Sequence, residues 1–305
     1  MSEGPEVKRT AEKIAEAILG KSIMDLRSKT IKDDVKQKII GSKVLSVDTY
    51  GKNILISFSS NVYLRNHMMM WGKWRIYEKA EYDSGKAKPP PRITWKRKLQ
   101  KSNSNSIENN FNKSDVSTIR NVQDDPRTRL ILITDTHAAV QFNGPILQFT
   151  EDNPLQHESI ARLGPDALKS KFDIGKARQR LKERGRMKIA DLLLDQTFIA
   201  GTGNKYKSEI LFLLKLWPFG PANSLSSGEE EKLLNEIPQV LQEGYLNGGR
   251  TRPQQHGEPS KWDFRHWVFR RAGRPCWVCG ARIVIDKQSS SRVTFWCPRC
   301  QQTSA

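Results

Sequence analysis

All four cysteines of the chain fall within its last thirty residues, and their spacing is typical of a metal site. Cys276 and Cys279 form one C-x2-C pair, Cys297 and Cys300 form a second, and seventeen residues separate the pairs. Four thiolates with this spacing suit a tetrahedral Zn²⁺ and leave no open position for a reacting water. Two disulfides are the alternative, which an intracellular chain disfavours. We therefore predict one structural zinc.

A second candidate site is the segment TFIAGTGNKYKSEILF, residues 197–212. A helix should end near Ile199, Gly201 and Gly203 should turn the chain, and Asn204 should cap the next helix. Glycines let the backbone approach a ligand closely, and a helix N-terminus offers free amide groups. The pattern therefore predicts an anion site, with a backbone phosphate as the anion. An ordinary turn between two helices explains the same residues about equally well.

The first residues, MSEGPEV, place an acid, Glu3, directly after a small residue, Ser2. A helix is predicted over 5–19, because Pro5 suits the first helical position and apolar residues recur on one face until Gly20. Neither feature explains the acid in front of the helix.

These candidate sites need elements to position them. Four strand-rich segments, KVLSVDTYGKNILISFSS, NVYLRNHMMMWGKWRIYE, TRLILITD and AAVQFNGPILQF, alternate with turn signals and predict a β-sandwich or barrel. Residues 80–126 interrupt this rhythm with a proline cluster and an Asn/Ser-rich tract, which we interpret as a long, largely disordered insertion. From about residue 155 the pattern predicts four or more helices. A loop at 247–261 then leads to the cysteine-rich segment.

Composition indicates the class of partner. The 305 residues carry a net charge of +18, with a pI near 9.8, and lysine and arginine are spread along the whole chain. Such an excess favours a polyanion, and the weak apolar face of the first helix favours nucleic acid over a membrane surface. The chain contains neither an apolar run of about 18 residues nor a signal-type apolar segment, so we predict an intracellular protein.

Three segments of the chain together resemble the Fpg/Nei family of DNA glycosylase/AP lyases, and its endonuclease VIII-like branch most. They are SEGPEV, GTGNKYKSEILF, and the cysteine-rich segment RRAGRPCWVCGARI with SSRVTFWCPRCQQ. The resemblance implies an α+β multidomain fold: an N-terminal helix plus β-sandwich (1–152), a helix–two-turn–helix domain (153–258) and a zinc-bound β-hairpin (259–305). It also implies that DNA lies between the first two domains, with the damaged nucleotide flipped out of the stack.

The resemblance gives the first residues a catalytic role. Family members attack C1′ of the damaged nucleotide with the α-amine exposed by removal of Met1, which here belongs to Ser2. An α-amine has a pKa near 7.7–8.0, against about 10.4 for lysine, so more of it is nucleophilic at neutral pH. Glu3 then protonates the opening sugar or moves protons, and Glu6 supports it. Most members have proline where this chain has Ser2, and a primary amine still forms the Schiff base that leads to strand cleavage by elimination.

The same resemblance assigns DNA contacts. Lys52 matches a lysine that contacts phosphate beside the lesion and helps catalysis, and His67, Asn204 and Arg292 match phosphate-binding residues. Met70 matches the apolar wedge that fills the gap left by the flipped base, with Met69 and Trp71 as helpers. Ordinary alternatives are a solvent-facing lysine, an exposed hairpin arginine and methionines that belong to the core.

Together these interpretations predict a bifunctional DNA glycosylase/AP lyase that removes oxidised bases. The resemblance to the endonuclease VIII-like branch implies a preference for pyrimidines, which the 247–260 loop, short for a lesion-capping loop, supports weakly. The predicted partner is damaged DNA and the predicted state is a monomer. The location is the cytoplasm or nucleoid of a bacterium or the nucleus of a eukaryote. The alternatives are a catalytically impaired or inactive DNA-binding zinc protein of the same fold, because Ser2 replaces proline, and an RNA-binding zinc protein.

Overall fold

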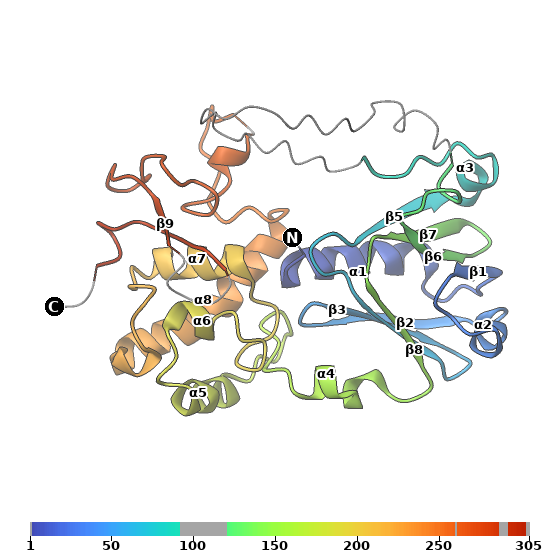
Figure 1. Cartoon of the computed structure of the whole chain (residues 1–305), viewed down its shortest axis with the longest axis horizontal. Helices are drawn as coiled ribbons and strands as arrows, with labels where there is room; N and C mark the ends of the chain where they lie inside the picture. Colours follow the sequence, from blue (N-terminus) through green and yellow to red (C-terminus); the bar gives the residue numbers. More distant parts are fainter. Residues whose placement is uncertain (1, 92–120, 260, 287–291, 303–305) are drawn as a thin grey trace, which may run out of the picture.

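The computed structural model describes residues 2–91, 121–259, 261–286 and 292–302. Two β-sheets with the first helix occupy one half of the molecule, and the helical domain with a small hairpin occupies the other (Figure 1). The N-terminus lies at the junction of the two halves. In the described residues, no helix is long and apolar enough to cross a membrane.

Eight strands of the N-terminal half form two antiparallel four-stranded sheets, in the orders β1-β6-β7-β5 and β2-β3-β4-β8. Their bounds are β1 Asp25–Ser28, β2 Val44–Tyr50, β3 Asn53–Phe58, β4 Tyr63–His67, β5 Lys73–Glu78, β6 Thr128–Ile133, β7 His137–Phe142 and β8 Ile146–Thr150. The helices of this half are α1 Gly4–Ile18, α2 Asp33–Ile39 and α3 Lys79–Asp83. The predicted β-sandwich is thus confirmed, and the first helix begins one residue before the predicted start.

The core of the sandwich contains one face of α1 together with the inner faces of both sheets. Val7, Ile14 and Ile18 of α1 are fully buried, as their helical spacing predicts. Strand β6 is apolar on both faces, because Leu130 points into this core while Ile131 belongs to a second cluster on the outer face of the sheet. That outer face therefore needs a cover of its own.

The two ends of the 80–126 segment provide this cover, so the prediction of a disordered insertion is wrong there. Tyr82 of α3, Ala87 and Val122 are all buried in the outer cluster with β6 and β7. The buried carboxylate of Asp125 binds the guanidinium of Arg127 at 2.6 Å. The remainder of the segment, 92–120, lies outside the described residues.

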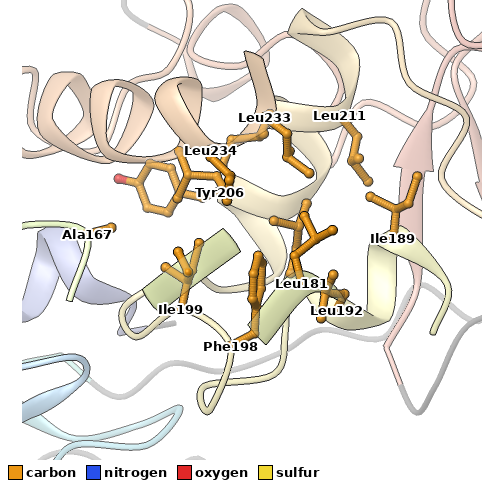
Figure 2. Close-up of a cluster of buried hydrophobic side chains, with 14 of the residues drawn as sticks. Ala167, Leu181, Ile189, Leu192, Phe198, Ile199, Tyr206, Leu211, Leu233 and Leu234 are labelled. Carbon is orange, nitrogen blue, oxygen red and sulfur yellow. The ribbon is translucent and has the colours of Figure 1, made fainter. Parts of the chain in front are cut away.

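The helical domain contains α4 Glu158–Ala161, α5 Ile174–Glu183, α6 Ile189–Leu192, α7 Asn204–Leu213 and α8 Ser227–Leu246, with short 3-10 turns η2 Pro154–Gln156 and η3 Ala222–Ser224. Figure 2 shows its core, where side chains from α5, α6, α8 and the 198–199 turn converge on α7. Helix α7 is the centre of the domain, because nine of its ten residues are buried, including lysine and glutamate.

The C-terminal segment packs against α7. It contains a 3-10 turn, η4 Trp262–Phe264, and a hairpin of β9 Val284–Asp286 and β10 Thr294–Trp296. The carboxylate of Glu209, fully buried on α7, accepts the backbone N–H groups of Trp267, Val268 and Phe269 at 2.8–2.9 Å. A buried carboxylate satisfied in this way fixes the 262–270 segment relative to the helix.

Candidate active site at the domain junction

The acid at the start of the chain binds the N-terminus of α7, 202 residues away. Glu3 is 1% exposed, and its carboxylate accepts the backbone N–H groups of Lys205 at 3.0 Å and Tyr206 at 3.3 Å. The next peptide adds a direct backbone bond, from Gly4 N–H to the carbonyl oxygen of Gly201 at 2.9 Å. A carboxylate at this position uses both the free amides and the positive end of the helix dipole.

The glycines of the GTG turn make this approach possible. A Cβ on Gly203 would lie 2.3 Å from the carboxyl carbon of Glu3, and a Cβ on Gly4 would lie 3.0 Å from the backbone of Gly201. The sequence predicted an anion at this helix N-terminus, and the anion that occupies it is the protein's own Glu3. The expected cap was wrong by one residue, because Gly203 is the N-cap and Asn204 is the first residue of α7.

Glu6, one helical turn after Glu3, joins the same cluster. Its Oε1 accepts from the ammonium of Lys205 at 2.5 Å and from the hydroxyl of Tyr206 at 3.5 Å, and its Oε2 accepts the N–H of Glu3 at 3.3 Å. Arg9 lies 3.6 Å from Oε1. Burial, followed by the charges of Glu6 and Glu3, raises the pKa of the Tyr206 hydroxyl, so it stays a donor.

Lys52 lies at the start of β3, in the turn that contacts the helical domain through Gly51. The N–H of Gly51 donates to the buried carboxylate of Asp166 at 2.8 Å. Burial lowers the pKa of Lys52 to about 8, Glu3 opposes that effect and Arg292 adds to it. The structure therefore brings Lys52, Glu3 and Arg292 into one electrostatic neighbourhood, although they come from β3, the chain start and the hairpin.

A second lysine of this neighbourhood, Lys207 on α7, was missed by the sequence analysis. Its side chain is fully buried, and its ammonium donates to Thr294 Oγ1 at 2.8 Å and to the carbonyl oxygen of Val293 at 3.3 Å. Burial lowers its pKa to about 8. The charge of Glu3 opposes this shift, and the charge of Arg292 adds to it. The available signal was the K-Y-K run just after the GTG turn. Arg292 itself is exposed, two residues before β10.

His67 ends β4 opposite Asn53, the residue after Lys52, and it anchors the turn that follows. Its Nδ1 accepts the N–H of Met69 at 3.1 Å, which leaves Nε2 as the donor of the ring. Burial lowers its pKa to about 4, and Lys52 and Arg65 contribute, so the ring is neutral at pH 7. A neutral ring with an Nε2 proton can still donate to a phosphate.

The Met68–Gly72 turn presents apolar side chains to solvent. Met69, Met70 and Trp71 are 48%, 49% and 43% exposed, whereas Met68 is buried in the core of the sandwich. Gly72 is required here, because a Cβ would lie 2.4 Å from the carbonyl oxygen of Met68. The core alternative thus holds for Met68 and fails for Met70.

Asn204, predicted to bind phosphate, is 4% exposed beside this cluster. Its Oδ1 is buried and has no hydrogen-bond partner within the described residues. A buried polar atom without a protein partner is available to a ligand.

A cavity of about 300 Å³ opens beside the two acids. The residues that line it are Glu3, Glu6, Lys205, the turn at 248–249, Trp262, Arg265, Phe269 and Arg270. The guanidinium carbons of Arg265 and Arg270 lie 5.6 and 5.7 Å from the centre of the Trp262 ring. These residues were not predicted from the sequence, although aromatic and arginine residues are interleaved in WDFRHWVFRR.

The four cysteines are free and clustered at the base of the hairpin. Their Sγ atoms all lie within 4.8 Å of one another, with Cys276 and Cys300 at 3.9 Å and Cys279 and Cys297 at 3.5 Å. Tetrahedral Zn–S bonds of about 2.3 Å place two sulfurs roughly 3.8 Å apart. The cluster therefore fits a metal ion with four thiolate ligands, and the disulfide alternative does not hold.

Comparison with known proteins agrees with this architecture. Family models described as the formamidopyrimidine-DNA glycosylase N-terminal domain and H2TH domain match residues 1–145 and 163–255. "Endonuclease 8" of Escherichia coli O9:H4 (strain HS) is 30% identical over 310 residues, which cover 99% of this chain and 100% of that protein. The Shigella sonnei (strain Ss046) Endonuclease 8 is equally similar.

Two solved structures have the same fold. The MutM (Fpg) protein of Thermus thermophilus gives a TM-score of 0.71 at 27% identity and covers 98% of each chain. Wild-type Lactococcus lactis Fpg, in complex with DNA that contains N7-benzyl-Fapy-dG, gives 0.73 at 22% identity, with 99% of this chain and 100% of that one covered.

These matches and the four-cysteine hairpin define the protein as a DNA repair enzyme of the glycosylase/AP lyase class, with a helix–two-turn–helix (H2TH) domain. The chain belongs to the Fpg/Nei family of DNA glycosylases.

Proposed function

We propose that this glycosylase removes oxidised bases, pyrimidines in preference, through a Schiff base formed by the α-amine of Ser2 once Met1 is removed. The observation that carries the proposal is the position of the neighbouring residue: Glu3 binds the N-terminus of α7, and Lys52 lies in its field. Ser2 is thereby placed at the junction of the two halves. A nucleophile beside a fixed acid suits attack on C1′.

The reaction divides among the residues as follows. The amine of Ser2 attacks C1′, the base leaves, and Glu3 supplies or removes the proton as the sugar opens. Glu6 supports Glu3, and Lys52 holds the phosphate beside the lesion. The imine at C1′ acidifies C2′, so loss of the C2′ proton and of the 3′ phosphate cleaves the strand.

DNA binds between residues 1–152 and 153–258, and the chain acts as a monomer. His67, Asn204 and Arg292 hold phosphates, and Met70 enters the stack where the damaged nucleotide has left. The flipped base enters the 300 Å³ cavity, where Trp262 offers a stacking surface next to Arg265 and Arg270. The short 247–260 loop supports the proposed preference for pyrimidine lesions.

We also propose that the metal is one Zn²⁺ held by Cys276, Cys279, Cys297 and Cys300, and that it keeps the hairpin and Arg292 rigid. Four thiolates leave it no role in the reaction steps. Metal analysis should find one zinc per chain, and removal by a chelator should lower the melting temperature and DNA affinity together. Unchanged affinity in zinc-free protein would contradict this role.

The proposal is tested by incubating the enzyme with abasic-site duplex, reducing the Schiff base with borohydride and locating the cross-linked peptide by mass spectrometry. We expect the cross-link on the amine of Ser2, and intact-mass measurement should show that Met1 is absent. A cross-link on a lysine, or none at all, contradicts the proposal. Excision rates on oxidised pyrimidines and on 8-oxoguanine in the same duplex test the substrate preference.

A further inference from the structure

Lys205 is a buried lysine whose ammonium contacts three separate segments. It lies 2.5 Å from Oε1 of Glu6 on α1, 3.2 Å from the carbonyl oxygen of Gly249 after α8, and 4.3 Å from the ring centre of Tyr206 on its own helix. The residue is 7% exposed. A buried ammonium is costly unless it is paired, so its place beside Glu6 is specific.

The same residue also holds the other acid. Its backbone N–H donates to Oε1 of Glu3 at 3.0 Å, while its side chain binds Glu6. Glu6 in turn accepts the N–H of Glu3 at 3.3 Å, and that N–H belongs to the peptide that joins Ser2 to Glu3. A continuous set of contacts therefore runs from the Lys205 ammonium through Glu6 to the peptide that carries Ser2.

Glu6 has a competing partner, which is why the charge on Lys205 matters. Arg9 lies 3.6 Å from Oε1 of Glu6 and is itself anchored by the carbonyl oxygens of Gly244 and Tyr245 at 2.7 and 2.8 Å. Without the ammonium of Lys205, Coulomb attraction would draw the carboxylate toward Arg9. The acceptor for the Glu3 N–H would then be lost.

We propose that Lys205 is a positioning residue for the nucleophile: its ammonium fixes the Glu6 carboxylate, and Glu6 fixes the Ser2–Glu3 peptide. This inference rests on the proposed role of the Ser2 amine. Lys205 does not touch the reacting atoms through this route. Its loss should therefore slow formation of the Schiff base and leave phosphate contacts intact.

The experiment compares Lys205→Met, which keeps the apolar stem, with Lys205→Arg, which keeps the charge. Two readouts are measured: the rate of borohydride-trappable Schiff base on abasic-site duplex, and Kd for a tetrahydrofuran-containing duplex that cannot form one. We expect Lys205→Met to trap roughly 10-fold more slowly or worse, because a misplacement of about 1 Å can cost about 100-fold. Its Kd should stay within about 2-fold, and Lys205→Arg should recover much of the rate.

A double-mutant cycle with Glu6→Gln separates positioning from general stabilisation. If Lys205 acts through Glu6, Lys205→Met should add no further loss in the Glu6→Gln background, and Lys205→Gln can replace it if the Met variant does not fold. Additive losses, or trapping and Kd that fall together, overturn the inference. Equal trapping by the wild type and Lys205→Met overturns it as well while leaving the Ser2 proposal standing, whereas a wild type that traps no DNA overturns both.

Discussion

The junction around Glu3 and the turn at Met68–Gly72 lie in the same site but are built in opposite ways. Glu3 is almost fully buried, both of its carboxylate oxygens accept backbone N–H groups, and glycines leave it no room to move. Met69, Met70 and Trp71 are nearly half exposed. The groups proposed to break bonds are thus fixed before DNA binds, which is where preorganisation is worth most. The apolar side chains proposed to displace a base, in contrast, stay exposed to solvent until they contact the bases of DNA.

The largest effect should come from filling the space at Gly203. In Gly203→Ala the new Cβ would lie 2.3 Å from the carboxyl carbon of Glu3, so the acid must leave its position. We expect loss of base excision by about 100-fold or more and a lower melting temperature. Gly228→Ala is the control, because nothing lies within 4 Å of that Cβ. Wild-type excision by Gly203→Ala would show that the fixed acid is unnecessary.

Glu3→Gln tests the chemistry of the junction while keeping its shape. The amide cannot act as the acid and replaces one acceptor by a donor, so base removal should fall by about 10²- to 10⁴-fold. DNA affinity should change little, because the phosphate contacts are assigned to other residues and Glu3 itself is 1% exposed. Excision assays on an oxidised-base duplex, with Kd measured in parallel, decide the point. Retained excision would remove Glu3 from the mechanism.

Two methionines in the turn allow a matched comparison. Met68→Ala removes a buried side chain and should cost about 2–5 kcal/mol of unfolding free energy. Met70→Ala should change that free energy by less than about 0.5 kcal/mol. It should nevertheless slow excision from duplex DNA more than from single-stranded DNA, since only the duplex leaves a gap to fill. Urea unfolding and excision assays check both variants, and equal rates on the two substrates would count against the wedge.

The effect furthest from the reaction is a pH dependence of stability from Lys207. Its pKa is about 8 when folded, against an ordinary 10.5, so between these values the unfolded chain binds more protons than the folded one. The free energy of unfolding should therefore rise with pH, by up to about 1.4 kcal/mol per unit. Below about pH 8 both states are protonated and this slope disappears.

Urea unfolding at pH 7, 9 and 10 measures this slope. Lys207→Met should reduce it, whereas Lys13→Met, at an exposed position of α1, should not. Lys52, whose pKa is also lowered to about 8, contributes a slope of the same sign. An identical slope in Lys207→Met would mean that the lysine is not buried as an ammonium.

Periodicity and spacing were sufficient for the sandwich, the helical domain and the cysteine cluster, because each depends on local pattern. Spacing alone could not reveal that Glu3 binds α7, since 202 residues separate the partners. The ends of the 80–126 segment were mispredicted for a different reason. Polar composition suggested disorder, but β6 has apolar residues on both faces, and TRLILITD already required a second cover.

The burial of charged residues within an apolar helix was the other feature that the sequence did not predict. From the sequence, Lys205 and Lys207 would be expected to face solvent, because buried lysines are rare. They are buried because each ammonium has a partner, Glu6 for Lys205 and Thr294 of β10 for Lys207. Both partners come from distant segments of the chain. Such pairs are visible only after the domains are assembled.

The bond between Glu3 and α7 also bears on how the enzyme is made. The ribosome synthesises Glu3 202 residues before Lys205, the helix residue whose N–H group binds it. At about 5–20 residues per second, roughly 10–40 s pass between the two events. During that interval Glu3 has no helix to bind, so the proposed nucleophile has no acid fixed beside it. Under the proposed mechanism, the ability to cut DNA therefore arises only after both halves of the chain have been synthesised and have docked.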